Sequence, residues 1–272
     1  MKTTIIAALA AALQLGTTAA ELAASESVQA GALYTVPSGS SDTITSISGT
    51  FRVPDVSGLT SGPKAGKKGI FGFSIWIGIG GYSGPGSPSQ CATSSAAMRA
   101  GVDVYWDGWE GSPMVPFAWY QYGVPEEKGQ FAYAGFNIEA GDLIRVTTSA
   151  EGTNVTAIME NFGNVKSTVG ATAIQRMTPT FGVGENVGTT LCRTEAAWMV
   201  EDNLNEEDTP APITMANFTD ITFGEMSLKT KAGAAAAALT SAKVVNINVA
   251  EQGGQLTDCS ALSPTEFRCR RV

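Results

Sequence analysis

The stretch Ala196-Ala197-Trp198-Met199-Val200-Glu201-Asp202 reads as a β-strand that ends on carboxylates. Side chains alternate along a strand, so Trp198 and Val200 would point to one face and Ala197, Met199 and Glu201 to the other. Similar runs rich in Val, Ile, Thr and aromatic residues recur along the chain between clusters of Gly, Pro, Ser and Asn. These runs are Thr43–Phe51, Gly69–Ile79, Gly101–Trp106, Leu143–Thr148, Val155–Glu160, Ala196–Glu201, Ile221–Phe223 and Val244–Val249. Many short strands with scarce helical periodicity predict an all-β sandwich or barrel.

Local patterns refine this prediction. Leu143–Thr147 and Val155–Met159 flank Ser149–Asn154, which contains Gly, and this arrangement is typical of a β-hairpin. The Gly/Pro/Ser-rich segment Gly81–Gln90 predicts a loop, whereas Ala232–Ala238 fits either a short helix or a loop. Neither segment marks a domain boundary and no internal repeat is present, so we expect one domain.

The N-terminus has the pattern of a secretory signal peptide. Met1-Lys2 gives a basic start, Ile5 to Leu15 is uncharged, and small residues follow at Thr18 to Ala20. We expect residues 1–20 to be the signal, with cleavage after Ala20 or Ala24, and residues 21–272 to form the single domain. The apolar run is too short to span a membrane. The sequence therefore predicts a secreted, extracellular protein.

The four cysteines are Cys91, Cys192, Cys259 and Cys269. An even number in an exported chain predicts two disulfides, although four buried free thiols are the alternative. Four cysteines allow three pairings, and the spacing alone does not choose between them.

The composition excludes several classes of function. The formal net charge is −8 with 15% charged residues, which argues against a nucleic acid partner and against an anionic membrane surface. There is no histidine, which excludes Ser-His-Asp and Cys-His catalysis and His-based zinc sites. No metal or organic cofactor is expected. A hydrolase of this composition has to use carboxylates and amides. Asn154-Val155-Thr156 and Asn217-Phe218-Thr219 are glycosylation sequons.

Five segments, in this order, resemble one known family, the secreted fungal glutamic peptidases (eqolisins). They are Gly49–Pro54, Trp76–Gly81, Gly101–Asp103, Ala118–Tyr120 and Trp198–Asp202. The resemblance implies a concanavalin A-like β-sandwich of two curved antiparallel sheets, with a substrate groove on one curved face. It also implies that Cys91 pairs with Cys192, which leaves Cys259 and Cys269 to close a small loop.

In that family a glutamate acts as general base towards water, and a glutamine holds the water and stabilises the oxyanion. Glu201 stands at the glutamate position, and Arg99, two residues before Gly101, stands at the glutamine position. Arginine has five donors and no acceptor, so Arg99 can stabilise an oxyanion but cannot orient water by accepting its proton. A structural ion pair with Glu201 is the alternative role for Arg99, and Gln90 and Gln121 are candidate replacements for the missing amide.

The chain is also rich in aromatic residues that suit either a groove or a core. Trp76, Trp119 and Tyr120 are the candidate substrate-binding residues, and packing in the core is the alternative. The remaining members of the aromatic set are Trp106, Trp109 and Tyr122.

The resemblance implies a secreted acid endopeptidase in which Glu201 activates water, impaired by Arg99 at the glutamine position. Its partner would be a protein or peptide substrate, and we expect a monomer. The alternative is a non-catalytic member of the family that binds peptide or glycan outside the cell, favoured by Arg99 and by family acidic residues replaced at Gly80 and Phe117. A weaker alternative is a glucanase-like hydrolase, which needs a second carboxylate opposite Glu201, and Asp103 is the candidate.

Overall fold

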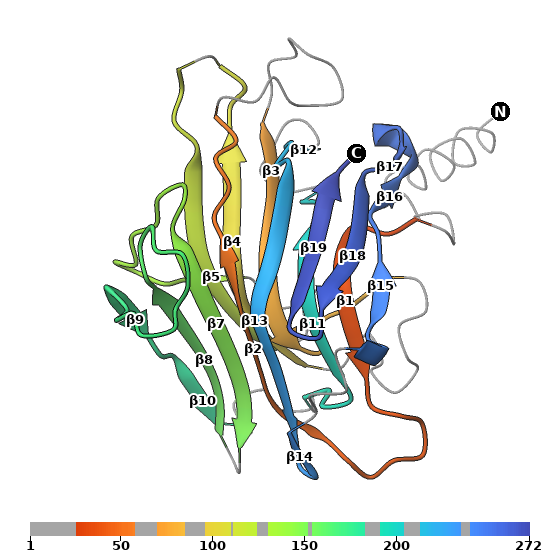
Figure 1. Cartoon of the computed structure of the whole chain (residues 1–272). Coiled ribbons are helices and arrows are strands. Elements are labelled where there is room, and N and C mark those ends of the chain that lie inside the picture. The colour runs from red at the N-terminus through yellow and green to blue at the C-terminus, as the bar shows by residue number, and fades with distance from the viewer. Residues whose placement is uncertain are drawn as a thin grey trace, which may run out of the picture.

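The computed structural model describes the chain in nine segments, and the remaining residues lie outside the description. The described segments are residues 26–57, 70–84, 96–109, 111–123, 130–151, 154–182, 191–203, 213–234 and 240–272. The predicted signal peptide, Gln90 and Cys91 therefore lie outside the described residues. The strands of the described segments form two large antiparallel sheets, which can be followed by their labels in Figure 1.

The first sheet carries the candidate site and has the strand order β15-β1-β11-β3-β4-β5-β6, with β12 alongside β3. All of these pairs are antiparallel except β12 with β3, which is parallel. Its strands are β1 (Gln29–Thr35), β3 (Phe71–Ile79), β4 (Ala97–Trp106), β5 (Val115–Gly123), β6 (Phe131–Ala132), β11 (Glu195–Glu201), β12 (Thr214–Met215) and β15 (Lys243–Val245).

The second sheet has the order β10-β8-β7-β2-β13-β19-β18, with β9 beside β8 and β14 beside β13. A small separate pair joins β16 (Asn248–Val249) to β17 (Gly254–Gln255), on either side of a 3₁₀ turn, η2 (Ala250–Gln252). The strands of the second sheet are β2 (Ile44–Arg52), β7 (Leu143–Glu151), β8 (Asn154–Asn161), β9 (Gln175–Met177), β10 (Thr180–Gly182), β13 (Asp220–Thr230), β14 (Gly233–Ala234), β18 (Thr257–Ser263) and β19 (Glu266–Arg271).

The core forms because the strands of both sheets alternate apolar residues towards each other. Trp198 and Val200 of β11 belong to the large buried cluster between the sheets, as predicted. Ala197 and Met199 point to the opposite face, where they form a second, smaller buried cluster with Trp76 and Trp119. Both faces of the first sheet therefore carry buried apolar residues, and the second face is the one that also carries Glu201.

The local predictions are confirmed where strands pair in sequence. β7 and β8 form the predicted antiparallel hairpin, and its turn residues 152–153 lie outside the described residues. The predicted run Val244–Val249 is not one strand, because it divides between β15 and β16. The tract Ala232–Ala238 begins as β14 at Gly233–Ala234, and residues 235–239 lie outside the described residues.

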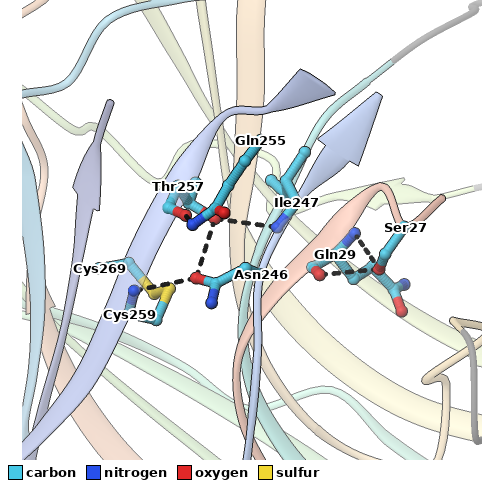
Figure 2. The surroundings of a disulfide bond; sticks show 8 residues. All are labelled: Ser27, Gln29, Asn246, Ile247, Gln255, Thr257, Cys259 and Cys269. Atoms are coloured by element: carbon cyan, nitrogen blue, oxygen red, sulfur yellow. Dashed lines mark hydrogen bonds between the residues drawn. A yellow bond between two sulfur atoms is a disulfide. The ribbon is translucent and has the colours of Figure 1, made fainter. Parts of the chain in front are cut away.

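The C-terminal hairpin is closed by a disulfide between Cys259 of β18 and Cys269 of β19, which face each other in the strand register. Asn246, next to β15, accepts a hydrogen bond from Cys259 N at 2.9 Å and one from Thr257 Oγ1 at 3.4 Å (Figure 2). Cys192 is also disulfide-bonded. The hairpin thus extends the second sheet, while the Cys259 backbone and the Thr257 side chain contact Asn246, the residue directly after the edge strand β15 of the first sheet.

Within the described residues, no helix has the length and apolarity that a membrane crossing requires.

Candidate active site

Three polar residues form a row across neighbouring strands on the second face of the first sheet. Ser74 of β3 lies opposite Glu201 of β11 on one side and opposite Asp103 of β4 on the other. Directly opposed residues of antiparallel strands point to the same face, so these side chains share one surface. The register therefore places Glu201 and Asp103 on either side of Ser74.

Two tryptophans in the next row each donate a hydrogen bond to one of these carboxylates. Trp76 Nε1 lies 2.5 Å from Glu201 Oε2, and Trp119 Nε1 lies 2.6 Å from Asp103 Oδ1. Both indoles are fully buried, as expected for large side chains whose one polar atom has a partner. They form the floor of the site and fix the direction of each carboxylate.

Arg99 of β4 lies above this floor. Its Cζ is 5.2 Å from the centroid of the Trp76 ring and 5.6 Å from that of Trp119, distances at which a guanidinium is attracted by an indole face. Its Nη1 lies 3.3 Å from Glu201 Oε2, and the Arg99 and Glu201 side chains are 10% and 22% exposed. The predicted contact between Arg99 and Glu201 therefore exists, and Glu201 remains partly open to solvent.

Gln121 of β5 lies opposite Arg99 in the register, and its Oε1 accepts a hydrogen bond from Arg99 Nε at 2.5 Å. The amide oxygen therefore holds the guanidinium rather than approaching Glu201. Of the two glutamines considered as replacements, Gln121 contacts Arg99, and Gln90 lies outside the described residues.

Asp103 belongs to a buried network and is only 2% exposed. Besides the Trp119 bond, its Oδ1 lies 2.5 Å from Ser74 Oγ, and its Oδ2 lies 3.4 Å from Tyr105 OH. Asn203, two residues after Glu201, completes the network through Ser74 and Tyr105. These contacts make Asp103 a buried hydrogen-bond acceptor that orients Ser74, Trp119 and Tyr105.

Small residues allow the strands and rings to approach this closely. A Cβ at Gly101 would meet the backbone of Ile75 and lie 2.7 Å from Trp76 Cβ. A Cβ at Gly78 would lie 2.6 Å from Arg99 Cβ. Glycine at these two positions is therefore required for Trp76 and Arg99 to occupy the same surface.

The predicted aromatic residues divide between the two faces of the sheet. Trp76 and Trp119 are at the site, whereas Tyr120 points to the other face of β5 and stacks on Phe131 with ring centroids 5.6 Å apart. Tyr122 packs beside Phe181 on that same face. Trp106 is buried at the end of β4, and Trp109 is 51% exposed in the loop that follows. Ser74 and Asn203 are site residues that the sequence reasoning missed, although alternation from Trp76 and Glu201 places both on this face.

Asp202, the residue after Glu201, points to the opposite side and is 3% exposed. Burial raises its pKa to about 7, against the lowering effects of the Gln252 hydrogen bond and the Arg271 charge, while the nearby Glu201 charge raises it further. Gln252 Nε2 donates to Asp202 Oδ2 at 2.6 Å, and Oδ1 has no hydrogen-bond partner among the described residues. The last residue of β11 therefore places one carboxylate in the candidate site, and the residue after it places another in the interior.

The two predicted glycosylation sequons differ in their accessibility. Asn154 is exposed at the start of β8. Asn217 is half-buried, and its Oδ1 accepts a hydrogen bond from Thr219 N at 3.1 Å. Among the described residues, no group of three or more His, Cys, Asp or Glu side chains is arranged to hold a metal ion.

Comparison with known proteins agrees with this arrangement. The profile of the peptidase A4 family matches residues 27–271. Aspergillopepsin-2 of Aspergillus niger is 28% identical over 232 residues, which cover 80% of this chain and 70% of that protein. The crystal structure of scytalido-glutamic peptidase with a peptide-based transition state analog superposes with a TM-score of 0.63 at 25% identity, covering 91% of this chain and 99% of that one. A second crystal structure of that peptidase, with a transition state analog inhibitor, matches equally well.

Proposed function

The chain belongs to the peptidase A4 family, the glutamic peptidases, and from this membership we propose that it is a secreted acid endopeptidase with Glu201 as its general base. The observation that carries the proposal is the placement of Glu201. Its carboxylate is partly exposed on the open face of the sheet, with Oε2 held by Trp76 and Arg99 and Oε1 free of hydrogen bonds to the described residues. One oxygen is thus anchored while the other is available to accept a proton.

In the proposed reaction Glu201 takes a proton from water as the water oxygen attacks the carbonyl carbon of a peptide bond. The negative charge that develops on the carbonyl oxygen is stabilised by N–H groups of Arg99. When the carbon–nitrogen bond breaks, the protonated Glu201 returns its proton to the leaving nitrogen. A carboxylic acid and an amine result, and no cofactor takes part.

Arg99 makes this a slow enzyme in our proposal. A glutamine amide offers both a donor and an acceptor to water, whereas a guanidinium offers only donors. Arg99 also contacts the oxygen of Glu201 that Trp76 anchors, so substrate has to compete with an existing ion pair. The lost orientation of water is the expected cause of a reduced turnover rate.

The test is cleavage of an unfolded protein by the purified chain between pH 2 and pH 6. We expect weak cleavage by the wild type, a fall of at least about 100-fold in kcat/KM for Glu201→Gln, and a gain of about 10-fold or more for Arg99→Gln. Arg176→Gln is the matched control, because Arg176 pairs with Glu160 on the other sheet and should leave the rate unchanged. Thermal melting of each variant confirms that it is folded.

The second candidate is a non-catalytic protein that holds an extracellular peptide or glycan, and the Arg99–Glu201 ion pair favours it. It replaces the first candidate if neither the wild type nor Arg99→Gln cleaves the unfolded protein at any pH. In that case the same variants are assayed for binding of peptides and cell-wall glycans.

A further inference from the structure

An apolar pocket lies on the same sheet, beyond the row of Glu201, Ser74 and Asp103. Its volume is about 310 Å³, at the lower end of the range for small-ligand sites. The ends of β3, β4 and β5 and the start of β12 surround it. Its lining residues are Ile70, Tyr105, Trp106, Asp107, Pro113, Val115 and Ile213. None of these residues takes part in the chemistry proposed for Glu201.

Side chains of this region stay exposed although they are large and apolar. Val115 is 60% exposed, Ile70 is 42% exposed, and Phe117 is 40% exposed. Phe117 lies opposite Asp103 in the register, and Val115 lies opposite Tyr105. Alternation along β5 therefore places Phe117 and Val115 on the face of Trp119 and Gln121, so one apolar strip runs from the site to the pocket.

The pocket has walls held in place by contacts that also reach the site. Tyr105 lies over Gly72, where an added Cβ would be 2.7 Å from Tyr105 Cδ1. The Tyr105 hydroxyl contacts Asp103 and Asn203, which both contact Ser74, the residue opposite Glu201 in the strand register. On the other side, Trp106 Nε1 donates to Ser112 O at 3.2 Å and so holds the loop that carries Asp107 and Pro113.

The distance from Glu201 fits an extended peptide. Glu201 lies on β11 and Tyr105 lies on β4, two strands away across β3. Tyr105 is also two residues along β4 from Asp103, which is in the row of Glu201. Val115 lies opposite Tyr105 on β5, one strand further from Glu201. With about 4.8 Å between strands and about 3.3 Å per residue, the pocket lies roughly 12–16 Å from Glu201. An extended peptide covers that distance in about three to five residues.

We propose that this pocket is a specificity subsite that takes a bulky apolar side chain, such as Leu or Phe, three to five residues from the bond held at Glu201. The proposal rests on the proposed function for its substrate class, a peptide extended along the groove. Continuity of the apolar strip with the site argues for the same occupant in both places. Burial of the exposed Val115, Ile70 and Phe117 surface supplies the binding free energy.

The test uses Glu201→Gln, so that binding is measured without cleavage. The probes are fluorescein-labelled twelve-residue peptides with one Phe at the centre and one Leu placed three, four or five residues away on either side, in a Ser/Gly/Ala host. We expect a Leu at the matching position to tighten binding about 10-fold over the Ser peptide, measured by fluorescence anisotropy at pH 4. Val115→Asp in the same background should abolish that gain.

Val169→Asp is the matched control, because Val169 is 83% exposed and lies in the segment after β8, far from the pocket in the strand order. Ile70→Asp is a second pocket variant in case Val115→Asp does not fold. Equal binding of Leu and Ser peptides by the parent protein overturns the proposal. So does a dimer that Val115→Asp dissociates in size-exclusion chromatography, because a second copy would then be the occupant of the strip.

The experiments distinguish failure of the proposed catalysis from failure of the proposed subsite. A protein that binds the Leu peptides tightly but never cleaves them refutes the proposed catalysis and leaves the subsite in place. Cleavage without any preference for Leu, mapped by mass spectrometry of the products from an unfolded protein, refutes the subsite and leaves the catalysis in place.

Discussion

Two successive carboxylates, Glu201 at the end of β11 and Asp202 directly after it, have opposite environments in this protein. Glu201 is partly exposed on the second face of the first sheet, and Asp202 faces the interior beside Gln252 and Arg271. Burial of Asp202 disfavours its ionised form, which is why its pKa rises to about 7 from the ordinary value of 3.8. The folded chain therefore binds this proton more tightly than the unfolded chain does.

That difference predicts how stability changes with pH. Between about pH 4 and pH 7 the folded state holds a proton that the unfolded state has lost, so the free energy of unfolding falls as the pH rises through this range. The free energy of unfolding falls by up to about 4 kcal/mol in total, because the Asp202 pKa differs by about three units between the folded and unfolded states. Asp202→Asn should remove most of this loss, measured by urea denaturation at pH 4 and pH 7.5.

Asp258→Asn is the matched control, because Asp258 is 54% exposed in its pair with Arg270. A wild type with equal stability at both pH values would contradict the prediction, as would an Asp202→Asn variant that still loses stability on passing from pH 4 to pH 7.5.

At the scale of the element, the C-terminal hairpin of β18 and β19 connects the two sheets. β19 pairs with β13 of the second sheet, and Asn246 holds Cys259 N from the side of β15, at the edge of the first sheet. Replacing both Cys259 and Cys269 by serine should cost roughly 2–3 kcal/mol, because the disulfide closes a loop with a sequence separation of 10. The measurement is the urea midpoint at pH 4, and an unchanged midpoint would show that strand pairing alone holds the hairpin.

The elements also show what the sequence could predict. Strands with their own apolar alternation, such as β3, β7, β8 and β11, were predicted because the pattern is local. β1 was not, because Gln29–Thr35 contains Gly and Ala and becomes a strand through pairing with β11 and β15. Alternation predicted which face Glu201 occupies, whereas the contact of Gln121 with Arg99 depends on the β4–β5 register, which periodicity does not encode.

At the scale of the whole molecule, two carboxylates with opposite shifts set limits on the stable pH range. Glu225 of β13 has a positive φ of 48° and binds residues of the segment after β8 and of β7. Its carboxylate accepts hydrogen bonds from Ser167 Oγ at 3.0 Å, Thr168 N at 3.0 Å and Arg145 Nη2 at 2.7 Å. Partial burial acts to raise its pKa, but the bonds from Thr168 and Arg145 outweigh it and lower the pKa to about 2 from 4.5.

The pKa of Glu225 is shifted in the opposite direction to that of Asp202, so its effect on stability has the opposite pH dependence. Because the folded pKa of Glu225 is below the unfolded one, its contribution to stability is complete above about pH 4.5 and is lost as the pH falls towards 2. Together the two groups predict a melting temperature that is highest between about pH 4 and pH 5 and falls on both sides. Melting curves are measured from pH 1.5 to pH 8. Glu225→Gln should reduce only the fall in melting temperature below about pH 4, and Asp202→Asn should reduce only the fall above about pH 5. Glu266→Gln, at an exposed site, should change neither side, and a wild-type melting temperature that rises steadily up to pH 8 would contradict the prediction.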